Sequence, residues 1–307
     1  MLGILDRAGD STSVTPTKLP ILRATIRSSR RGMGVLYIML MALAFAPVST
    51  ALSQSLAAMD ATALVRRAVQ NRLDAEKNHR LVRYVLHRTD EHHDTTKEII
   101  ETVDGYVARL IKLDGKPLSA EADRAELERL DTLAAHPEMQ EHRHKGEQKD
   151  AERVDRLMTL LPDAFLYQYE GTVSCATGQC TRLSFTPNPH FTPPNLEADL
   201  LRGVAGEVWI DQTQERLTRL DGHFIDDVDF GFGILGKLNK GGTVILEQSD
   251  IGGHDWELTG LTLHVTGKAL MVKTLSYKIS EEASQFAPVS PGLRYRDAIQ
   301  LLKQAEP

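Results

Sequence analysis

Hydrophobic and polar residues alternate with two different spacings along the chain, and these spacings predict where helices and strands lie. In residues 60–79 the apolar side chains follow the 3.6-residue period of a helix and form one stripe: Leu64, Val65, Ala68, Val69 and Leu73. Strand-like runs follow at 80–92, 97–105 and 106–115. Asp104 and Gly105 separate the last two runs and predict a tight two-residue hairpin.

A helical insertion is predicted next, at about 119–161. Ser119 is a plausible N-cap for its first helix, because a serine oxygen accepts a hydrogen bond from an unpaired backbone N–H group. The stretch 138–156 is almost wholly charged or polar. It is expected to be a solvated helix docked only by its C-terminal turn, or a flexible arm.

From residue 165 onward the pattern returns to strands, with candidate runs at 165–173, 181–187, 206–211, 216–225, 242–250, 256–267 and 270–280. Leu261, Leu263 and Val265 share one face by the two-residue period of a strand. A short helix is predicted near the end of the chain, within 293–304. This order predicts an α+β fold: a curved, mostly antiparallel sheet, an unclosed β-barrel, covered by helices. An apolar crevice between sheet and helices is the physical basis for expecting a ligand cavity.

The first 53 residues predict export from the cytoplasm. Four arginines at 23–31 precede an uncharged run of about 15 residues at 32–46, and small residues follow at Ala51 and Ser53. These are the parts of a secretory signal peptide cleaved after Ser53. The run is shorter than the roughly 20 residues that span a bilayer, so the mature chain is not expected to cross the membrane. An uncleaved anchor and a twin-arginine signal at Arg30–Arg31 are the alternatives.

The charge of the mature chain argues against nucleic acid as a partner. The whole chain has a net charge of −6, and the first 53 residues contain six Lys/Arg and two acids, so cleavage leaves −10. An acidic protein is repelled by phosphate backbones and anionic lipid surfaces. Residues 54–307 are long enough for one large α+β domain with its polar insertion.

Two cysteines, Cys175 and Cys180, flank a turn-like Ala-Thr-Gly-Gln segment between two strand-like runs. In an oxidising compartment such a pair is expected to form a disulfide that staples a hairpin. A zinc site would need two more soft ligands nearby. Neither a metal nor a cofactor is therefore expected.

A family resemblance rests on residues 204–280 and on the order of the elements. The strand 206–211 (GEVWID) contains an aromatic residue and an aspartate, and 214–220 (QERLTRL) returns with arginine after a short turn. This unit resembles the outer-membrane lipoprotein-sorting proteins, the LolA/LolB-like carriers. The resemblance covers about two thirds of the mature chain and implies an unclosed β-barrel with a helical lid that holds acyl chains. The polar insert and the cysteine pair depart from that pattern.

Two sets of residues are candidates for ligand contact. The expected cavity lining consists of alternating strand residues: Val208, Ile210, Leu261, Leu263, Val265, Leu275, Tyr277 and Ile279. A glycine-rich loop at its mouth supplies possible gate residues: Phe230, Phe232, Ile234 and Leu235. That loop, GFGILGK, also matches phosphate-binding patterns, but three aspartates precede it and a strand-like run follows, which disfavours nucleotide. A loop tucked into the core is the simpler interpretation.

The main hypothesis is a periplasmic, non-enzymatic carrier or binding protein for lipid or acylated lipoprotein. The histidine pairs at 92–93 and 142/144 lack a third metal ligand in sequence, and no recognisable nucleophile motif is present. The alternative is an envelope structural or interaction protein with a filled interior and a protein partner. A hydrolase of unknown type is a third hypothesis.

Overall fold

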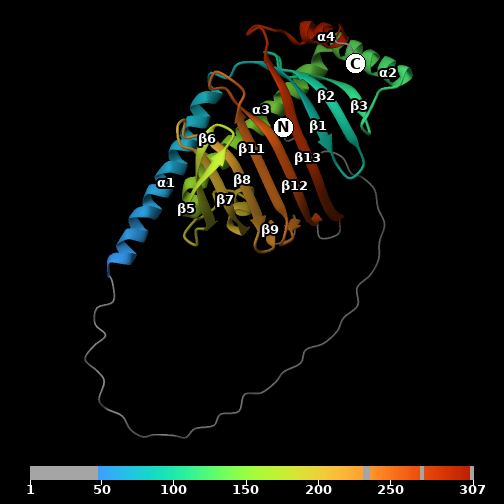
Figure 1. Ribbon diagram of the computed structural model, residues 1–307. Helices are drawn as coiled ribbons and strands as arrows, with labels where there is room; N and C mark the ends of the chain where they lie inside the picture. The colour runs from blue at the N-terminus through green and yellow to red at the C-terminus, as the bar shows by residue number, and fades with distance from the viewer. Residues whose placement is uncertain (1–47, 231–235, 270–272, 305–307) are drawn as a thin grey trace, which may run out of the picture.

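A computed structural model describes residues 48–230, 236–269 and 273–304 (Figure 1). Its helices are α1 (Val48–Glu76), α2 (Ala120–Ala135), α3 (Pro137–Ala164) and α4 (Tyr295–Gln304), with a 3₁₀ helix, η1 (Ala198–Gly203). Its strands are β1 (Val82–Thr89), β2 (Asp94–Ile100), β3 (Val107–Leu113), β4 (Lys116–Pro117), β5 (Phe165–Cys175), β6 (Gly178–Pro187), β7 (Val204–Asp211), β8 (Leu217–Phe224), β9 (Val228–Phe230), β10 (Gly236–Leu238), β11 (Thr243–Asp250), β12 (Trp256–Ala269) and β13 (Lys273–Pro288).

The described strands form one antiparallel sheet that does not close on itself. Its order is β4-β3-β2-β1-β13-β12-β11-β8-β7-β6-β5, and β10 joins β9 to β12 off this path. In Figure 1 the helix α3 crosses behind the sheet, while α4 lies at its upper end. The prediction of a mostly antiparallel, unclosed sheet covered by helices is confirmed.

Two hydrophobic clusters lie on opposite faces of this sheet. The first lies under α1 and the end of α3, against β5 to β8 and β12, and includes Val265. The second joins β2 and β3 to α2 and α4, and includes Ile100. Strand pairing places Val265 on the same face as Ile99, and Ile100 therefore points to the other face. We call these faces the inner and the outer face, respectively.

β2 and β3 form the predicted antiparallel hairpin, but their connection is longer than the predicted two-residue turn at Asp104–Gly105. β2 ends at Ile100 and β3 begins at Val107, so six residues connect them. Residues of α3 and α4 bind this connection. Gln140 Nε2 donates to the carbonyl of Asp104 at 2.9 Å, and the Asp104 carboxylate accepts from the backbone N–H of Tyr295 at 3.2 Å. A turn does form within this connection, where the Gly105 N–H donates to the carbonyl of Thr102 at 3.2 Å, and contacts from α3 and α4 bind the residues around it.

The polar stretch 138–156 is one continuous helix, α3, and it is docked at both ends. Near its start Gln140 is only 1% exposed and bonds to the β2–β3 connection, while Leu161 is buried near its end. The expectation that only its C-terminal turn docks is therefore wrong. The predicted N-cap of α2 is confirmed, because Ser119 Oγ accepts from the Ala122 N–H at 3.2 Å.

Candidate ligand-binding seam

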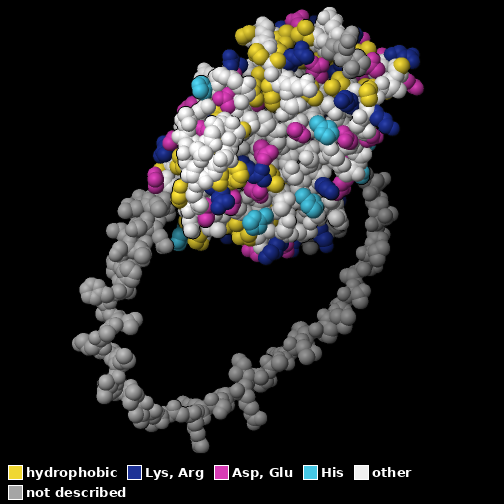
Figure 2. All heavy atoms as spheres, in the orientation of Figure 1, with side chains coloured by type: hydrophobic (Ala, Val, Ile, Leu, Met, Phe, Trp, Pro, Cys, Tyr) yellow, Lys and Arg dark blue, Asp and Glu magenta, His cyan; other side chains and the backbone are white. Residues whose placement is uncertain are grey.

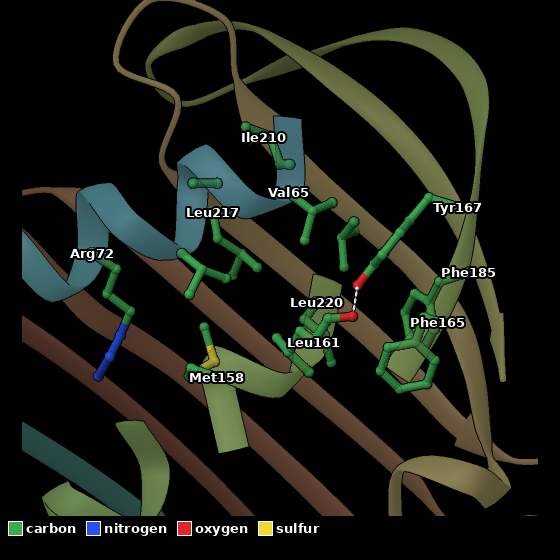
Figure 3. A pocket seen from close by; sticks show the side chains of 13 residues that line it. Val65, Arg72, Met158, Leu161, Phe165, Tyr167, Phe185, Ile210, Leu217 and Leu220 are labelled. Carbon is green, nitrogen blue, oxygen red and sulfur yellow. Dashed lines mark hydrogen bonds between the residues drawn. The ribbon is translucent and has the colours of Figure 1, made fainter. Parts of the chain in front are cut away.

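The candidate site is the apolar interface between the inner face of the sheet and the two helices that cover it (Figure 3). We call it the seam. Thirteen residues from α1, α3 and β5 to β8 line it: Val65, Ala68, Val69, Arg72, Met158, Leu161, Phe165, Tyr167, Phe185, Val208, Ile210, Leu217 and Leu220. Arg72 carries the charge among them, and Figure 3 shows its side chain directed away from the aromatic residues.

Aromatic side chains close one end of the seam. The rings of Phe165 and Phe185 lie 4.7 Å apart between centroids, and Tyr167 packs edge-on to Phe165 at 6.3 Å. The Tyr167 hydroxyl donates to the carbonyl of Leu161 at 2.9 Å, which ties β5 to the last turns of α3 (Figure 3). Burial raises the pKa of Tyr167 far above its usual range, so this hydroxyl stays protonated as a donor.

The seam is almost filled by its own side chains. The free space among its thirteen residues is about 10 Å³, which has room for about one water molecule. Ligand pockets for drug-sized molecules are typically about 300–1,000 Å³. An acyl chain can therefore enter only if α1 or α3 moves away from the sheet.

The eight predicted lining residues all lie on the inner face, as the strand pairing requires. Val208 and Ile210 line the seam itself. Leu263, Val265 and Tyr277 belong to the surrounding cluster or pack against it. Leu261 and Ile279 are buried farther along the same face, and Leu275 is half-buried there.

Of the four predicted gate residues, only Phe230 has a described backbone, as the last residue of β9. Phe232, Ile234 and Leu235 lie outside the described residues. The gate hypothesis stays a prediction.

Sequence reasoning missed the contribution of the helices and of β5 and β6 to the seam. Val65, Ala68 and Val69 were recognisable as the apolar stripe of a helix, but a stripe does not reveal which surface it covers. Phe165, Tyr167 and Phe185 lie on strands distant in sequence from the predicted lining. Only Phe185, between Ser184 and Thr186, alternates with polar neighbours and gave a usable signal.

Ion pairs at the surface attach α1 to its neighbours around the seam. Arg67 pairs with Glu215 in the β7–β8 turn at 2.9 Å, and Arg72 pairs with Asp155 of α3 at 3.0 Å. The Arg67 side chain is 50% exposed, so solvent weakens its pair. These contacts position α1 and add little to its attachment, so the cost of separating it from the sheet comes mainly from its buried apolar residues.

A second polar group lies where the chain leaves α1. His79 Nε2 is 2.8 Å from Glu101 Oε2, and its Nδ1 is 3.4 Å from Glu257 Oε1. The hydrogen bond with Glu101 raises the pKa of His79 to about 9. Burial raises the pKa of Glu257 to about 7. Near neutral pH the imidazolium therefore binds Glu101, which directly follows β2, and faces Glu257 of β12.

The predicted disulfide between Cys175 and Cys180 is confirmed and closes the β5–β6 hairpin. Asp211 lies within 4.8 Å of both sulfur atoms, so the three residues have the spacing of a metal site. The sulfur atoms are bonded to each other, however, and thus are not thiolate ligands. Asp211 instead accepts from the backbone N–H groups of Thr213 and Gln214 and holds the β7–β8 turn.

Among the helices that the structure describes, none combines the length and apolar character needed to cross a membrane.

No protein-family model matches the chain, and no curated protein matches it. Similar solved structures include one described as an outer membrane lipoprotein-sorting protein domain from Vibrio parahaemolyticus, with 8% identity and a TM-score of 0.28 over 78% of this chain and 100% of that one. A LolA superfamily protein from Nitrosomonas europaea has 9% identity and a TM-score of 0.25, covering 75% and 94%.

Both structures are of proteins from the group that residues 204–280 were expected to resemble. MucB, solved in complex with MucA, is also similar, with 9% identity and a TM-score of 0.23 over 75% of this chain and 99% of that one. Because all these TM-scores are below 0.5, the function of the chain is inferred from its own residues.

Proposed function

We propose that this chain is a non-enzymatic periplasmic binding protein that holds an acyl chain of a lipid or lipoprotein between α1 and the inner face of the sheet. The seam supports this proposal because twelve of its thirteen lining residues are apolar or aromatic. Burying an acyl chain there would contribute about 0.8 kcal/mol per methylene group. The disulfide fits an oxidising compartment such as the periplasm.

Entry of the acyl chain requires α1 to separate from the sheet, because the closed seam has room for about one water molecule. Leu263, Leu275 and Tyr277 extend the apolar inner face beyond the seam and are only half-buried. A chain that displaces α1 thus finds further apolar surface along β12 and β13.

Titration with a fluorescent fatty acid tests this function. Ala68 lies in the seam with 2% exposure, and Ala68→Leu would overpack it, because the added carbons need more than the remaining space. Ala134→Leu is the matched control, because Ala134 packs against the second cluster on the outer face. We expect A68L to weaken binding at least about tenfold, a loss of about 1.4 kcal/mol, and A134L to leave it unchanged. A wild-type protein without affinity for the probe would overturn the proposal.

The filled interior favours a second candidate, an envelope interaction protein with a protein partner. Among the described strands, β5 ends the sheet and pairs on one side only. Its residues Leu166 and Tyr169 are 53% and 54% exposed. Such an edge can pair with an extended segment of another protein. In this case Tyr169→Lys would abolish a cross-linked complex, while A68L would have no effect on it.

A further inference from the structure

Arg216, the residue immediately before β8, is buried for no reason that the fold itself explains. Its side chain is 8% exposed, and its Nε atom is buried without a hydrogen-bond partner. Within the described residues it forms no ion pair with a carboxylate. A buried, unpaired guanidinium is costly, which makes this position a candidate for a bound group.

Arg216 is held in place by a chain of polar contacts. Its guanidinium lies over the ring of Trp256, 5.6 Å from the centroid. The Trp256 Nε1–H donates to Gln214 Oε1 at 2.9 Å, and Gln214 Nε2 donates to Asp250 at 3.1 Å. These hydrogen bonds hold the ring on which the guanidinium lies.

This guanidinium lies next to the polar end of the seam. Leu217, the following residue, lines the seam, and so does Arg72. Arg72 is near enough to lower the pKa of Arg216, together with the larger effect of burial. The apolar seam thus has cationic side chains at the end opposite to its aromatic residues.

The neighbouring carboxylates have other partners. Asp155 pairs with Arg72, Asp250 accepts from Gln214 and from the backbone N–H of Gly252, and Glu257 faces His79. Glu76, the remaining acid near Arg216, is exposed to solvent. An additional acceptor is therefore the group that would complete the surroundings of Arg216.

We propose that Arg216 binds the anionic headgroup of an acyl-bearing ligand whose chain occupies the seam. A guanidinium offers paired N–H donors that match a carboxylate or a phosphate. This inference rests on the proposed function and narrows its ligand to an anionic amphiphile.

The test compares two probes with the same alkyl chain: a long-chain fatty acid and the corresponding fatty alcohol. We expect the wild-type protein to bind the acid about 10- to 100-fold more tightly, as a charge-assisted hydrogen bond would provide. Arg216→Gln should remove this preference, whereas Arg216→Lys should keep part of it. General destabilisation would weaken both probes equally and leave their ratio unchanged.

Arg66→Gln is the control, because Arg66 forms an exposed ion pair with Asp163 and lies away from the lining. We expect R66Q to leave the ratio unchanged. Equal binding of acid and alcohol by the wild type would overturn the inference but not the proposed function. Binding of neither probe would overturn both. If acetate competes as well as the fatty acid does, Arg216 binds small free anions, and the proposal of an anionic amphiphile is overturned.

Discussion

The two hydrophobic clusters are built from similar residues but differ in how completely they are closed. In the outer-face cluster, Val107, Leu130, Ala298, Ile299 and Leu302 are all fully buried. In the inner-face cluster, buried residues are surrounded by a margin of partly buried ones, including Leu263 and Tyr277. Figure 2 shows the outer side, where hydrophobic side chains gather near α4 and scattered charges cover the sheet below. The outer-face cluster therefore stabilises the fold, while the inner-face cluster retains partly exposed apolar surface that a ligand can contact.

The largest expected effect is a difference in unfolding free energy between substitutions in the two clusters. Leu302→Ala should lower the free energy of unfolding by about 3–5 kcal/mol, because its neighbours cannot collapse into the cavity. Leu217→Ala, in the seam, should cost only about 2–3 kcal/mol because α1 can adjust. Denaturant unfolding measures both values. A greater loss for L217A than for L302A would contradict the comparison.

The disulfide is expected to contribute less, about 2 kcal/mol, because it closes a short loop. Replacing both Cys175 and Cys180 with alanine should lower the midpoint of chemical denaturation without changing the elements around α4. Far-ultraviolet circular dichroism of the folded variant provides the control. If the variant does not fold, the disulfide stabilises the protein by more than its short loop predicts.

Hydrogen exchange should distinguish the helices that cover the two clusters. Amides of α1 around 65–73 should exchange through local opening at a free energy at least about 1 kcal/mol lower than amides of α4. The exposed ion pairs of α1 and the complete burial of Ile299 and Leu302 are the reasons. Equal protection would mean that α1 is held as firmly over the seam as α4 is held in the outer-face cluster.

The smallest expected effect is a pH dependence at His79. Its pKa is raised to about 9, so its stabilising effect is complete below about 6.5 and lost as the pH rises through about 9. The side chain is 31% exposed, which limits the effect to less than about 1 kcal/mol. His79→Gln should flatten the fall in unfolding free energy between pH 7 and 9. An unchanged slope would exclude this residue as the cause.

The sequence predicted the fold better than the site. Alternation in β12 identified the inner-face residues Leu261, Leu263 and Val265, because a strand repeats every two residues. The burial of α4 was not evident, since a short amphipathic helix gives no indication of the surface on which it packs. The hairpin of β2 and β3 was predicted, but not the length of its connection, which Gln140 and Tyr295 bind from elements far away in sequence.

Arg216 illustrates the same limit. It stands in the segment that carries the family resemblance, but its burial, its stacking on Trp256 and its missing partner depend on four separate elements. No local pattern records that combination.

The helix α3 connects the β2–β3 connection to the seam. Gln140 is fixed to the β2–β3 connection at one end, and Leu161 lies in the seam 21 residues farther along. At about 1.5 Å per residue this arm is roughly 32 Å long, so a tilt of about 5° at the fixed end moves the far end by roughly 3 Å. A small tilt of α3 at the β2–β3 connection would therefore shift its side chains in the seam by nearly the width of a methyl group.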